Sequence, residues 1–222
     1  GLCAVYLRRM LQETPVFAEM QQRHALAAEL PLKTVLREHR GAIVLSMLLT
    51  WVLSAAIVVV ILMTPTLLQT LYGFDAATAL KANSLAIVFL SLGCVAAGAI
   101  VDRVGAGRVL LLGGLLLGVT SWTFYSSLKL HPGWLFPLYA LTGLLVGTIG
   151  AVPFVMVKAF PPVVRFSGLS FSYNVAYAIF GGLTPLVVSL LIKADPLGPA
   201  YYVAALCGLA VIIGLYLRGK GR

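Results

Sequence analysis

The sequence has few charged residues for its length. Only 10% of its 222 residues are charged, whereas 60% are hydrophobic and the mean hydropathy is +1.00. A soluble domain of this size has no interior that could bury so much apolar surface. A lipid bilayer can surround such a surface, so the composition predicts an integral membrane protein with the bilayer as its main partner.

Cysteine and histidine are also scarce. Cys3, Cys94 and Cys207 fall in apolar runs, and the three histidines lie in polar segments. Three scattered cysteines make neither a disulfide framework nor a metal site. We expect them to be small buried hydrophobic residues, and we expect no cofactor and no metal.

Acidic residues are the rarest charged groups, which leaves a formal net charge of +9. The basic residues lie between apolar runs and form no basic stripe with stacking aromatics, so we expect no nucleic-acid partner. No acid falls inside an apolar run. An intramembrane carboxylate is the usual proton carrier of a coupled transporter, so such a group would lie outside this segment. The acids are Glu13, Glu19, Glu29, Glu38, Asp75, Asp102 and Asp195.

Six apolar runs are long enough to cross a bilayer, which takes about 20 residues of helix. Backbone polar groups in lipid must be paired internally, which favours helices, and the alternating pattern of a membrane β-barrel is absent. The sequence therefore predicts an all-α integral membrane fold. The expected spans are about 42–63, 76–101, 109–128, 132–157, 167–192 and 199–217.

Several residues predict where helices begin and end. Asp75 can cap the second span, because its carboxylate can accept from free N–H groups at a helix start. Pro161 and Pro162 should end the fourth span, and Ser167 should cap the fifth. Pro31 should open a short amphipathic helix in "PLKTVLREHR".

Two pairs of glycines four residues apart predict close helix contacts. They are "GLLLG" (Gly114–Gly118) and "GLLVG" (Gly143–Gly147). In membranes such small-residue pairs let two backbones approach closely.

The chain opens on "GLCAVYLRRM", an apolar stretch too short to span a bilayer. The arginines follow the apolar part, which is the wrong order for a signal peptide. We expect the end of a helix whose beginning lies elsewhere, and hence a fragment. If the linker 12–40 is cytoplasmic, 13 of the 16 Lys and Arg lie on that side and 3 on the other. This asymmetry predicts a cytoplasmic linker and C-terminus.

The loop after the second span reads "GAIVDRVGAGR". It contains Gly98, Asp102, Arg103, Gly105 and Arg108 at the end of a membrane helix. This G-x-x-x-D-R-x-G pattern resembles the signature between helices 8 and 9 of the major facilitator superfamily. The usual pattern has paired basic residues directly after the second glycine, whereas here two residues precede Arg108.

Four further segments are similar to the metabolite:proton symporters of that superfamily. They are "LRRMLQETPVF", "FPPVVRFSG", "YNVAYAIFGGLTP" and "GPAYYVAALCGL". The resemblance implies the C-terminal half of a twelve-helix protein. Residues 1–11 would end helix 6, residues 12–40 would form the cytoplasmic central loop, and residues 41–222 would form helices 7–12. The N-terminal half would be a missing partner, and the location a bacterial inner membrane.

In "FPPVVRFSG" we expect Gly168 to permit close helix packing. Arg165 has two interpretations: it anchors the chain at the membrane interface, or it is a gate latch that pairs with an acid of the other half.

The next helix carries polar groups at depth. Tyr173 and Tyr177 share a face, and Asn174 lies beside them. Asn174 either makes a helix–helix hydrogen bond or faces a cavity, since an unpaired amide in lipid costs several kcal/mol. With Trp51 and Asn83, these three residues are the candidates for a solute cavity. The aromatic members could attract a methylated ammonium group.

Three functions are compatible with these residues. The resemblance implies a secondary active symporter, working by alternating access on a small organic acid or zwitterion together with protons. A second is a free-standing six-helix protein that acts as a homodimer or structural partner. A third is an intramembrane serine protease built on Ser170 in "GLSF". That nucleophile would need a base within about 3 Å, and no span contains a histidine or an acid. We therefore expect no enzyme.

Overall fold

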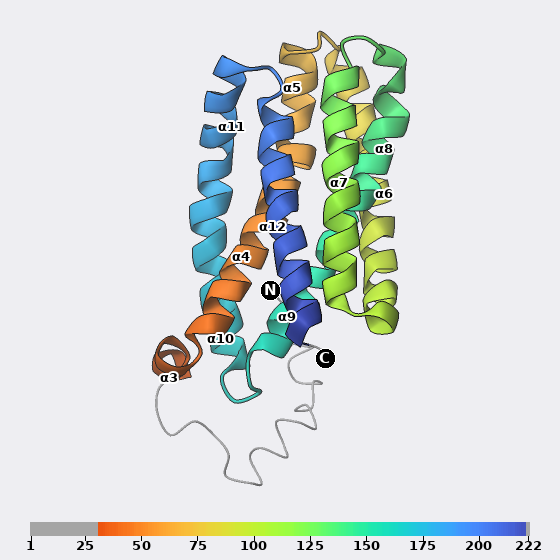
Figure 1. The fold of residues 1–222 in the computed structure, drawn as a ribbon. Coiled ribbons are helices and arrows are strands. Elements are labelled where there is room, and N and C mark those ends of the chain that lie inside the picture. Colours follow the sequence, from red (N-terminus) through yellow and green to blue (C-terminus); the bar gives the residue numbers. More distant parts are fainter. Residues whose placement is uncertain (1–30, 221–222) are drawn as a thin grey trace, which may run out of the picture.

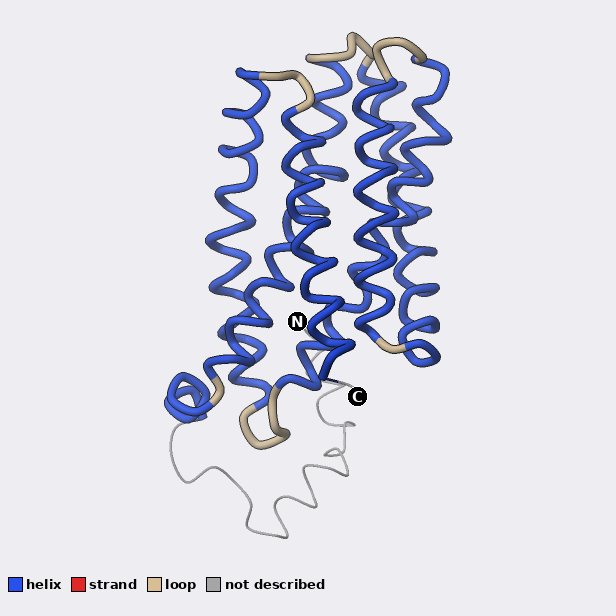
Figure 2. Tube along the Cα trace, viewed as in Figure 1, coloured by secondary structure: helices blue, strands red, loops and turns tan. Residues whose placement is uncertain are grey.

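The computed structural model describes residues 31–220, and the predictions for residues 1–30 lie outside them. Within that range all regular elements are helical, which confirms the predicted all-α fold (Figures 1 and 2). Helix α3 (Pro31–Glu38) forms where "PLKTVLREHR" predicts it. Six longer helices are apolar enough to cross a membrane, as predicted. They cover Arg40–Thr70, Ala76–Val104, Ala106–Ser127, Pro132–Ala159, Arg165–Ala194 and Gly198–Gly219.

The first span is longer than predicted. It comprises α4 (Arg40–Ala56), a π-helical segment η1 (Ile57–Met63) and α5 (Thr64–Thr70). The predicted end at Met63 is therefore wrong. In η1 the Thr64 N–H bonds to the Val59 carbonyl, five residues back, so a new α-helical segment starts at Thr64. Pro65 then lies in the first turn of that segment, where its missing N–H would have had no partner anyway.

The second span is α6 (Ala76–Val104), and its predicted cap is confirmed. Asp75 has an extended backbone, and its carboxylate accepts a hydrogen bond of 2.9 Å from the Thr78 N–H. Hydrogen bonding by Thr78, first through its side chain and then through its N–H, holds the pKa of Asp75 below its usual value. The helix ends at Gly105, whose φ of +86° is a conformation that side chains disfavour. Helix α7 (Ala106–Ser127) starts immediately after this turn.

The fourth span has three parts after the short turn η2 (Pro132–Trp134). They are α8 (Leu135–Val146), a 3₁₀ segment η3 (Gly147–Gly150) and α9 (Ala151–Ala159). As predicted, the helix ends before the two prolines, and Phe160 is already extended.

The fifth span consists of α10 (Arg165–Ala176), a second π-helical segment η4 (Tyr177–Gly181) and α11 (Gly182–Ala194). The predicted cap at Ser167 is wrong, because the helix begins two residues earlier with Val164 at its N-cap position. The Val164 N–H bonds to the Pro161 carbonyl at 3.2 Å, so the chain has already turned there. The last span, α12 (Gly198–Lys220), follows a short loop.

Glycines set the closest helix contacts, as the G-x-x-x-G pairs predict. A Cβ atom at Gly143 would overlap the Ala86 carbonyl, and one at Gly147 would overlap the backbone of Gly93. These contacts hold α6 against α8. Gly114 and Gly118 lie against Cys207 less tightly, since an added Cβ atom would be 3.1 Å from the Cys207 carbonyl oxygen and 3.4 Å from its Cβ atom, and they let α7 pack on α12.

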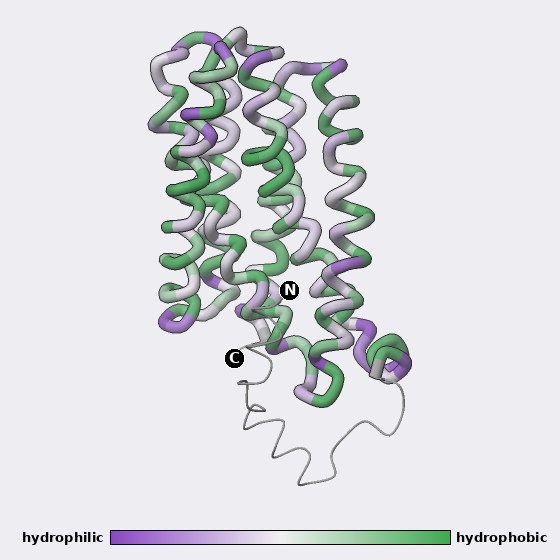
Figure 3. Tube along the Cα trace, turned by 180° about the vertical axis from the view of Figure 1, so that it is seen from behind, coloured by the Kyte–Doolittle hydropathy of each residue, from purple (hydrophilic) through white to green (hydrophobic). Residues whose placement is uncertain are grey.

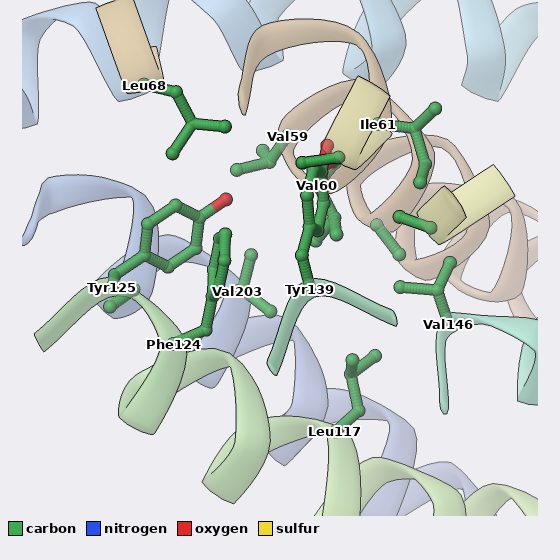
Figure 4. Close-up of a cluster of buried hydrophobic side chains, with 14 of the residues drawn as sticks. Val59, Val60, Ile61, Leu68, Leu117, Phe124, Tyr125, Tyr139, Val146 and Val203 are labelled. Carbon is green, nitrogen blue, oxygen red and sulfur yellow. The ribbon is translucent and has the colours of Figure 1, made fainter. Parts of the chain in front are cut away.

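The largest buried cluster lies between η1, α6, α7 and α8, with α12 at its edge. Figure 4 shows Phe124 between Tyr125 and Tyr139, with both ring pairs 4.9 Å apart. The two tyrosine hydroxyls point towards η1. The core therefore contains polar groups that need hydrogen-bond partners in or beside this π-helical segment.

The two ends of the bundle differ in charge. Hydrophobic residues occupy most of the length of the helices, and hydrophilic residues gather towards the two ends of the bundle (Figure 3). One end, here called the α3 end, carries α3, the α6–α7 turn, the loop before α10 and the end of α12 (Figure 1). The basic residues whose side chains are described are Lys33, Arg37, Arg40, Arg103, Arg108, Lys158, Arg165 and Arg218 near the α3 end, and Lys81, Lys129 and Lys193 near the opposite end.

Candidate solute cavity and gating loops

Trp51 belongs to a hydrogen-bonded cluster that joins three spans. Its ring stacks on Phe180 at 4.4 Å and 10°, and its Nε1–H donates to the Tyr202 hydroxyl at 3.1 Å. The Thr184 hydroxyl donates to the Phe180 carbonyl at 2.6 Å and lies 2.9 Å from the Tyr202 hydroxyl. A hydroxyl has one proton, so Thr184 must accept from Tyr202. The bonds therefore run in one direction, from Trp51 through Tyr202 and Thr184 to Phe180.

The three candidates on α10 and η4 lie close together on the surface of the bundle. Tyr173 and Tyr177 share a face, as predicted, with ring centroids 5.5 Å apart. Asn174 is exposed, and its amide donates to the Ser170 carbonyl of its own helix at 2.8 Å. Neither tyrosine ring contacts Trp51 within the described residues, although Phe180, which stacks on Trp51, follows Tyr177 by three positions.

Asn83 has a different hydrogen-bond partner, Tyr139 of the largest buried cluster. Its side-chain oxygen is 2.5 Å from the Tyr139 hydroxyl, which also lies 2.6 Å from the Val60 carbonyl in η1. Since a carbonyl can only accept, Tyr139 donates to Val60. The amide of Asn83, turned so that its NH₂ group faces the hydroxyl, can then donate to Tyr139.

A second pair of polar side chains, Thr64 and Tyr125, provides a hydrogen bond to the same π-helical segment, η1. The Thr64 hydroxyl donates to the Val59 carbonyl at 2.9 Å and accepts from the Tyr125 hydroxyl at 2.7 Å. Tyr72, in the loop that follows, donates to the Tyr125 carbonyl at 2.8 Å, and burial raises the pKa of Tyr72 to about 12. Its phenol therefore stays protonated and able to donate at neutral pH.

Replacing Tyr139 with phenylalanine should leave the Val60 carbonyl without its donor. Because an unpaired buried group is costly, we expect the unfolding free energy to fall by about 1–2 kcal/mol. The measurement is thermal unfolding of the purified chain in detergent. Tyr173→Phe is the matched control, because the Tyr173 hydroxyl makes no hydrogen bond within the described residues. Equal unfolding temperatures for the two variants would contradict the assigned bond.

The α6–α7 loop carries the motif residues at the α3 end. Asp102, Arg103 and Arg108 are all exposed, and Asp102 makes no hydrogen bond or ion pair within the described residues. Gly105 provides the turn. Gly98 has open space around the position of a Cβ atom, whereas Gly107 lies against the Gly214 carbonyl of α12. The close approach next to this loop is thus made by Gly107, which the sequence pattern did not single out.

Arg165 and Gly168 both contact Phe160, at the end of the preceding span. The Arg165 Nε–H donates to the Phe160 carbonyl at 3.2 Å. A Cβ atom at Gly168 would lie 2.5 Å from the Phe160 ring, so the predicted close packing of Gly168 is confirmed. Arg165 is thereby held by its own loop.

The opposite end has one polar cluster of its own. Asp195 accepts from the Leu197 N–H at 2.8 Å and from the Tyr201 hydroxyl at 2.9 Å. These bonds, with a smaller contribution from the charge of Lys129, hold the pKa of Asp195 below its usual value. Asp195 is therefore ionised at neutral pH and fixes the turn between α11 and α12.

Several residues that complete these clusters were not predicted from the sequence: Thr64, Tyr125, Tyr139, Phe180, Thr184 and Tyr202. Tyrosines in the middle of apolar runs were the available indication, because a buried phenol generally finds a hydrogen-bond partner. Between residues 31 and 220, no group of three or more His, Cys, Asp or Glu lies close enough to hold a metal ion.

Between residues 31 and 220, six apolar helices with several polar side chains hydrogen-bonded inside the bundle define an integral membrane protein of the helical class. Comparison with known proteins shows which proteins this chain is similar to. The chain is 30% identical to a citrate-proton symporter of Klebsiella pneumoniae over 96% of its own length and 49% of the symporter. It is 31% identical to a citrate-proton symporter of Salmonella typhi, over 96% of its own length and 50% of that symporter. It is 28% identical to the ectoine/proline transporter ProP of Corynebacterium glutamicum, over 96% of its own length and 45% of that transporter.

The chain thus spans about half the length of the curated relatives it matches. Over that length, the predicted resemblance to the metabolite:proton symporters of the major facilitator superfamily is confirmed, and the relatives are transporters rather than enzymes. No family model matches the chain, and no solved structure matches it.

Proposed function

We propose that the chain is the C-terminal six-helix half of a secondary active transporter. In this proposal, residues 41–222 correspond to helices 7–12, and a second six-helix half completes the solute pathway. The transporter moves a small organic acid or zwitterion together with protons, by rocking of the two halves around a central site. The names of the relatives, which include citrate-proton symporters and an ectoine/proline transporter, support this class of solute.

One observation carries the proposal: polar side chains lie uncovered at membrane depth. Asn174 is exposed and Tyr173 is 40% exposed. Asn174 lies about 14 Å along the helix from its start at Arg165, near the middle of a hydrocarbon layer about 30 Å thick. Facing lipid, the amide would have its second donor and its acceptor unpaired, at a cost of several kcal/mol. A second protein half or a water-filled cavity must therefore cover this face.

The proton pathway needs groups beyond the described residues. Asp102, within the last turn of α6, is the sole acid inside a span between residues 31 and 220, and it lies at the α3 end. A carboxylate that carries protons through the membrane would therefore belong to the other half. The proposal assigns Asp102, Arg103 and Arg165 to contacts between the halves when the α3 end closes.

The distribution of basic residues supports one orientation in the membrane. The α3 end carries most of the lysines and arginines whose side chains are described, and such residues are enriched on the cytoplasmic side of membrane proteins. We therefore place the α3 end and the C-terminus in the cytoplasm, in a bacterial inner membrane.

The test is solute uptake by the whole transporter in vesicles with an imposed proton gradient. Citrate, proline and betaine are the first solutes to try. If one is taken up, Asn174→Ala should reduce the rate at least about tenfold, because a hydrogen bond to a buried polar solute is worth about 1.5 kcal/mol or more. Thr123→Ala is the matched control. Its hydroxyl, like the Asn174 amide, bonds to a carbonyl four residues back, but on α7.

Two results would overturn the proposal. One is a whole protein that moves none of these solutes under a proton gradient. The other is uptake by the purified 222-residue chain alone, since the cavity would then need no second half.

A further inference from the structure

A pocket of about 750 Å³ opens at the α3 end, separate from the candidate solute cavity. It lies between the start of α4, the α6–α7 turn, α9 and the end of α12. Pockets that hold small molecules have volumes of about 300–1,000 Å³. Its size is therefore that of a binding site rather than of a packing defect.

Three basic side chains line this pocket, each from a different helix. They are Arg108 of α7, Lys158 of α9 and Arg218 of α12, and none of the described lining residues is acidic. Arg108 and Arg218 make no hydrogen bond or ion pair within the described residues, and the Lys158 ammonium lies 4.1 Å from the centre of the Phe154 ring. Three like charges around one pocket repel each other, so an anion bound there would relieve this repulsion.

The start of α7 adds further donors. Gly105 is its N-cap residue and supplies no side-chain acceptor, and Ala106, Gly107 and Arg108 also line the pocket. The first N–H groups of a helix have no partner within the helix, and the helix dipole makes this end attractive to anions. Backbone donors and basic side chains thus face the same space.

Apart from Tyr216, the other side chains of the lining are apolar, which distinguishes among anions. Leu45, Val104, Val155 and Leu217 contribute hydrocarbon surface next to the three cations. A free inorganic anion gains nothing from such a surface, whereas a phospholipid places a phosphate beside its glycerol and acyl chains. The pocket is also formed by helix ends, at the level where lipid headgroups lie.

We propose that this pocket binds the phosphate of an anionic phospholipid from the leaflet at the α3 end. Arg108, Lys158 and Arg218 hold the phosphate together with the first amides of α7. The apolar lining receives the glycerol and the beginning of the acyl chains. Basic pockets between membrane helices are a known means of headgroup recognition.

The experiment is native mass spectrometry of the purified 222-residue chain in neutral detergent, titrated with phosphatidylglycerol. Phosphatidylcholine and inorganic phosphate are titrated in parallel. The chain should retain phosphatidylglycerol at least about tenfold more tightly than phosphatidylcholine, because each basic residue contributes about 1 kcal/mol to binding of an anionic lipid. Inorganic phosphate at the same concentrations should not compete.

Two triple variants locate the site. Replacing Arg108, Lys158 and Arg218 with glutamine should reduce the affinity for phosphatidylglycerol at least about tenfold. The control replaces Lys81, Lys129 and Lys193 with glutamine, which removes the same charge at the opposite end and should leave the affinity unchanged. Equal losses in both variants, or equal retention of the two lipids by the unmodified chain, would overturn the proposal. Displacement of the lipid by inorganic phosphate would show a free-anion site instead and would also overturn it.

A further variant keeps the test valid if the pocket triple variant does not fold. Gly41 lines the pocket, and nothing lies within 4 Å of the position of its Cβ atom. Gly41→Leu should therefore fill part of the pocket without removing a charge or disturbing the helix. It should weaken binding of phosphatidylglycerol without lowering the unfolding temperature. Unchanged binding in this folded variant would contradict the proposed location.

Discussion

Replacing Gly93 with alanine is expected to destabilise the folded bundle by about 3 kcal/mol. The added Cβ atom would overlap the Leu144 carbonyl oxygen of α8, and backbone atoms cannot move aside as a flexible side chain can. Helices α6 and α8 would have to separate, which would also loosen the contact at Gly147. The measurement is thermal or denaturant unfolding of the purified chain in detergent.

Gly98→Ala is the matched control for this prediction, because it is the same substitution on the same helix. Nothing lies within 4 Å of a Cβ atom at Gly98. Alanine favours a helix by about 1 kcal/mol over glycine, so this variant should be as stable as the natural chain or more so. If Gly93→Ala were equally well tolerated, α6 and α8 would not touch as closely as the structure shows.

Replacing Gly105 with alanine should be the second most damaging change, at about 1–3 kcal/mol. Here the cause is backbone conformation and not crowding, since the space around a Cβ atom at Gly105 is open. The φ of +86° and ψ of 149° fall in a region that is nearly exclusive to glycine. The residue links α6 to α7, so the strain would be relieved by unwinding one of the two helix ends.

The readout for Gly105→Ala is the unfolding temperature, with Gly133→Ala as control. Gly133 lies in the short turn η2 at the start of the fourth span and also has open space around it, but its φ is not positive. We expect the control to unfold at the temperature of the natural chain. A Gly105→Ala chain with the same unfolding temperature would mean that the turn adopts another conformation.

The sequence was sufficient to predict the number and class of the helices, because each span satisfies its backbone internally and needs a nearly continuous apolar run. The Asp75 cap and the close packing at both glycine pairs were also predictable, since each is indicated by residues that lie within a few positions of one another in the sequence. The end of the first span was not predictable in the same way. Pro65 normally argues against a continuing helix, and only the π-helical segment before it makes the proline compatible.

The clusters around Trp51 and Tyr139 depend on contacts between residues far apart in the chain. The partner of Trp51 is Tyr202, and the partners of Tyr139 are Val60 and Asn83. No local pattern states which helices become neighbours, so the hydrogen-bond partners of Trp51 and Asn83 could not be predicted from the sequence. The face formed by Tyr173, Asn174 and Tyr177 was predictable, because it lies on one helix and follows its periodicity.

The position of α4 in the bundle has a consequence for biosynthesis. Translation starts at the amino terminus, so α4 enters the bilayer before α9, α10 and α12, which later cover it. Before then, these later helices cannot pair the hydroxyl groups of α4. Thr50 donates to the Ser46 carbonyl at 2.8 Å and Ser54 to the Trp51 carbonyl at 3.1 Å, both within α4. Because these bonds need no other helix, α4 can remain in lipid during synthesis without exposing either hydroxyl unpaired.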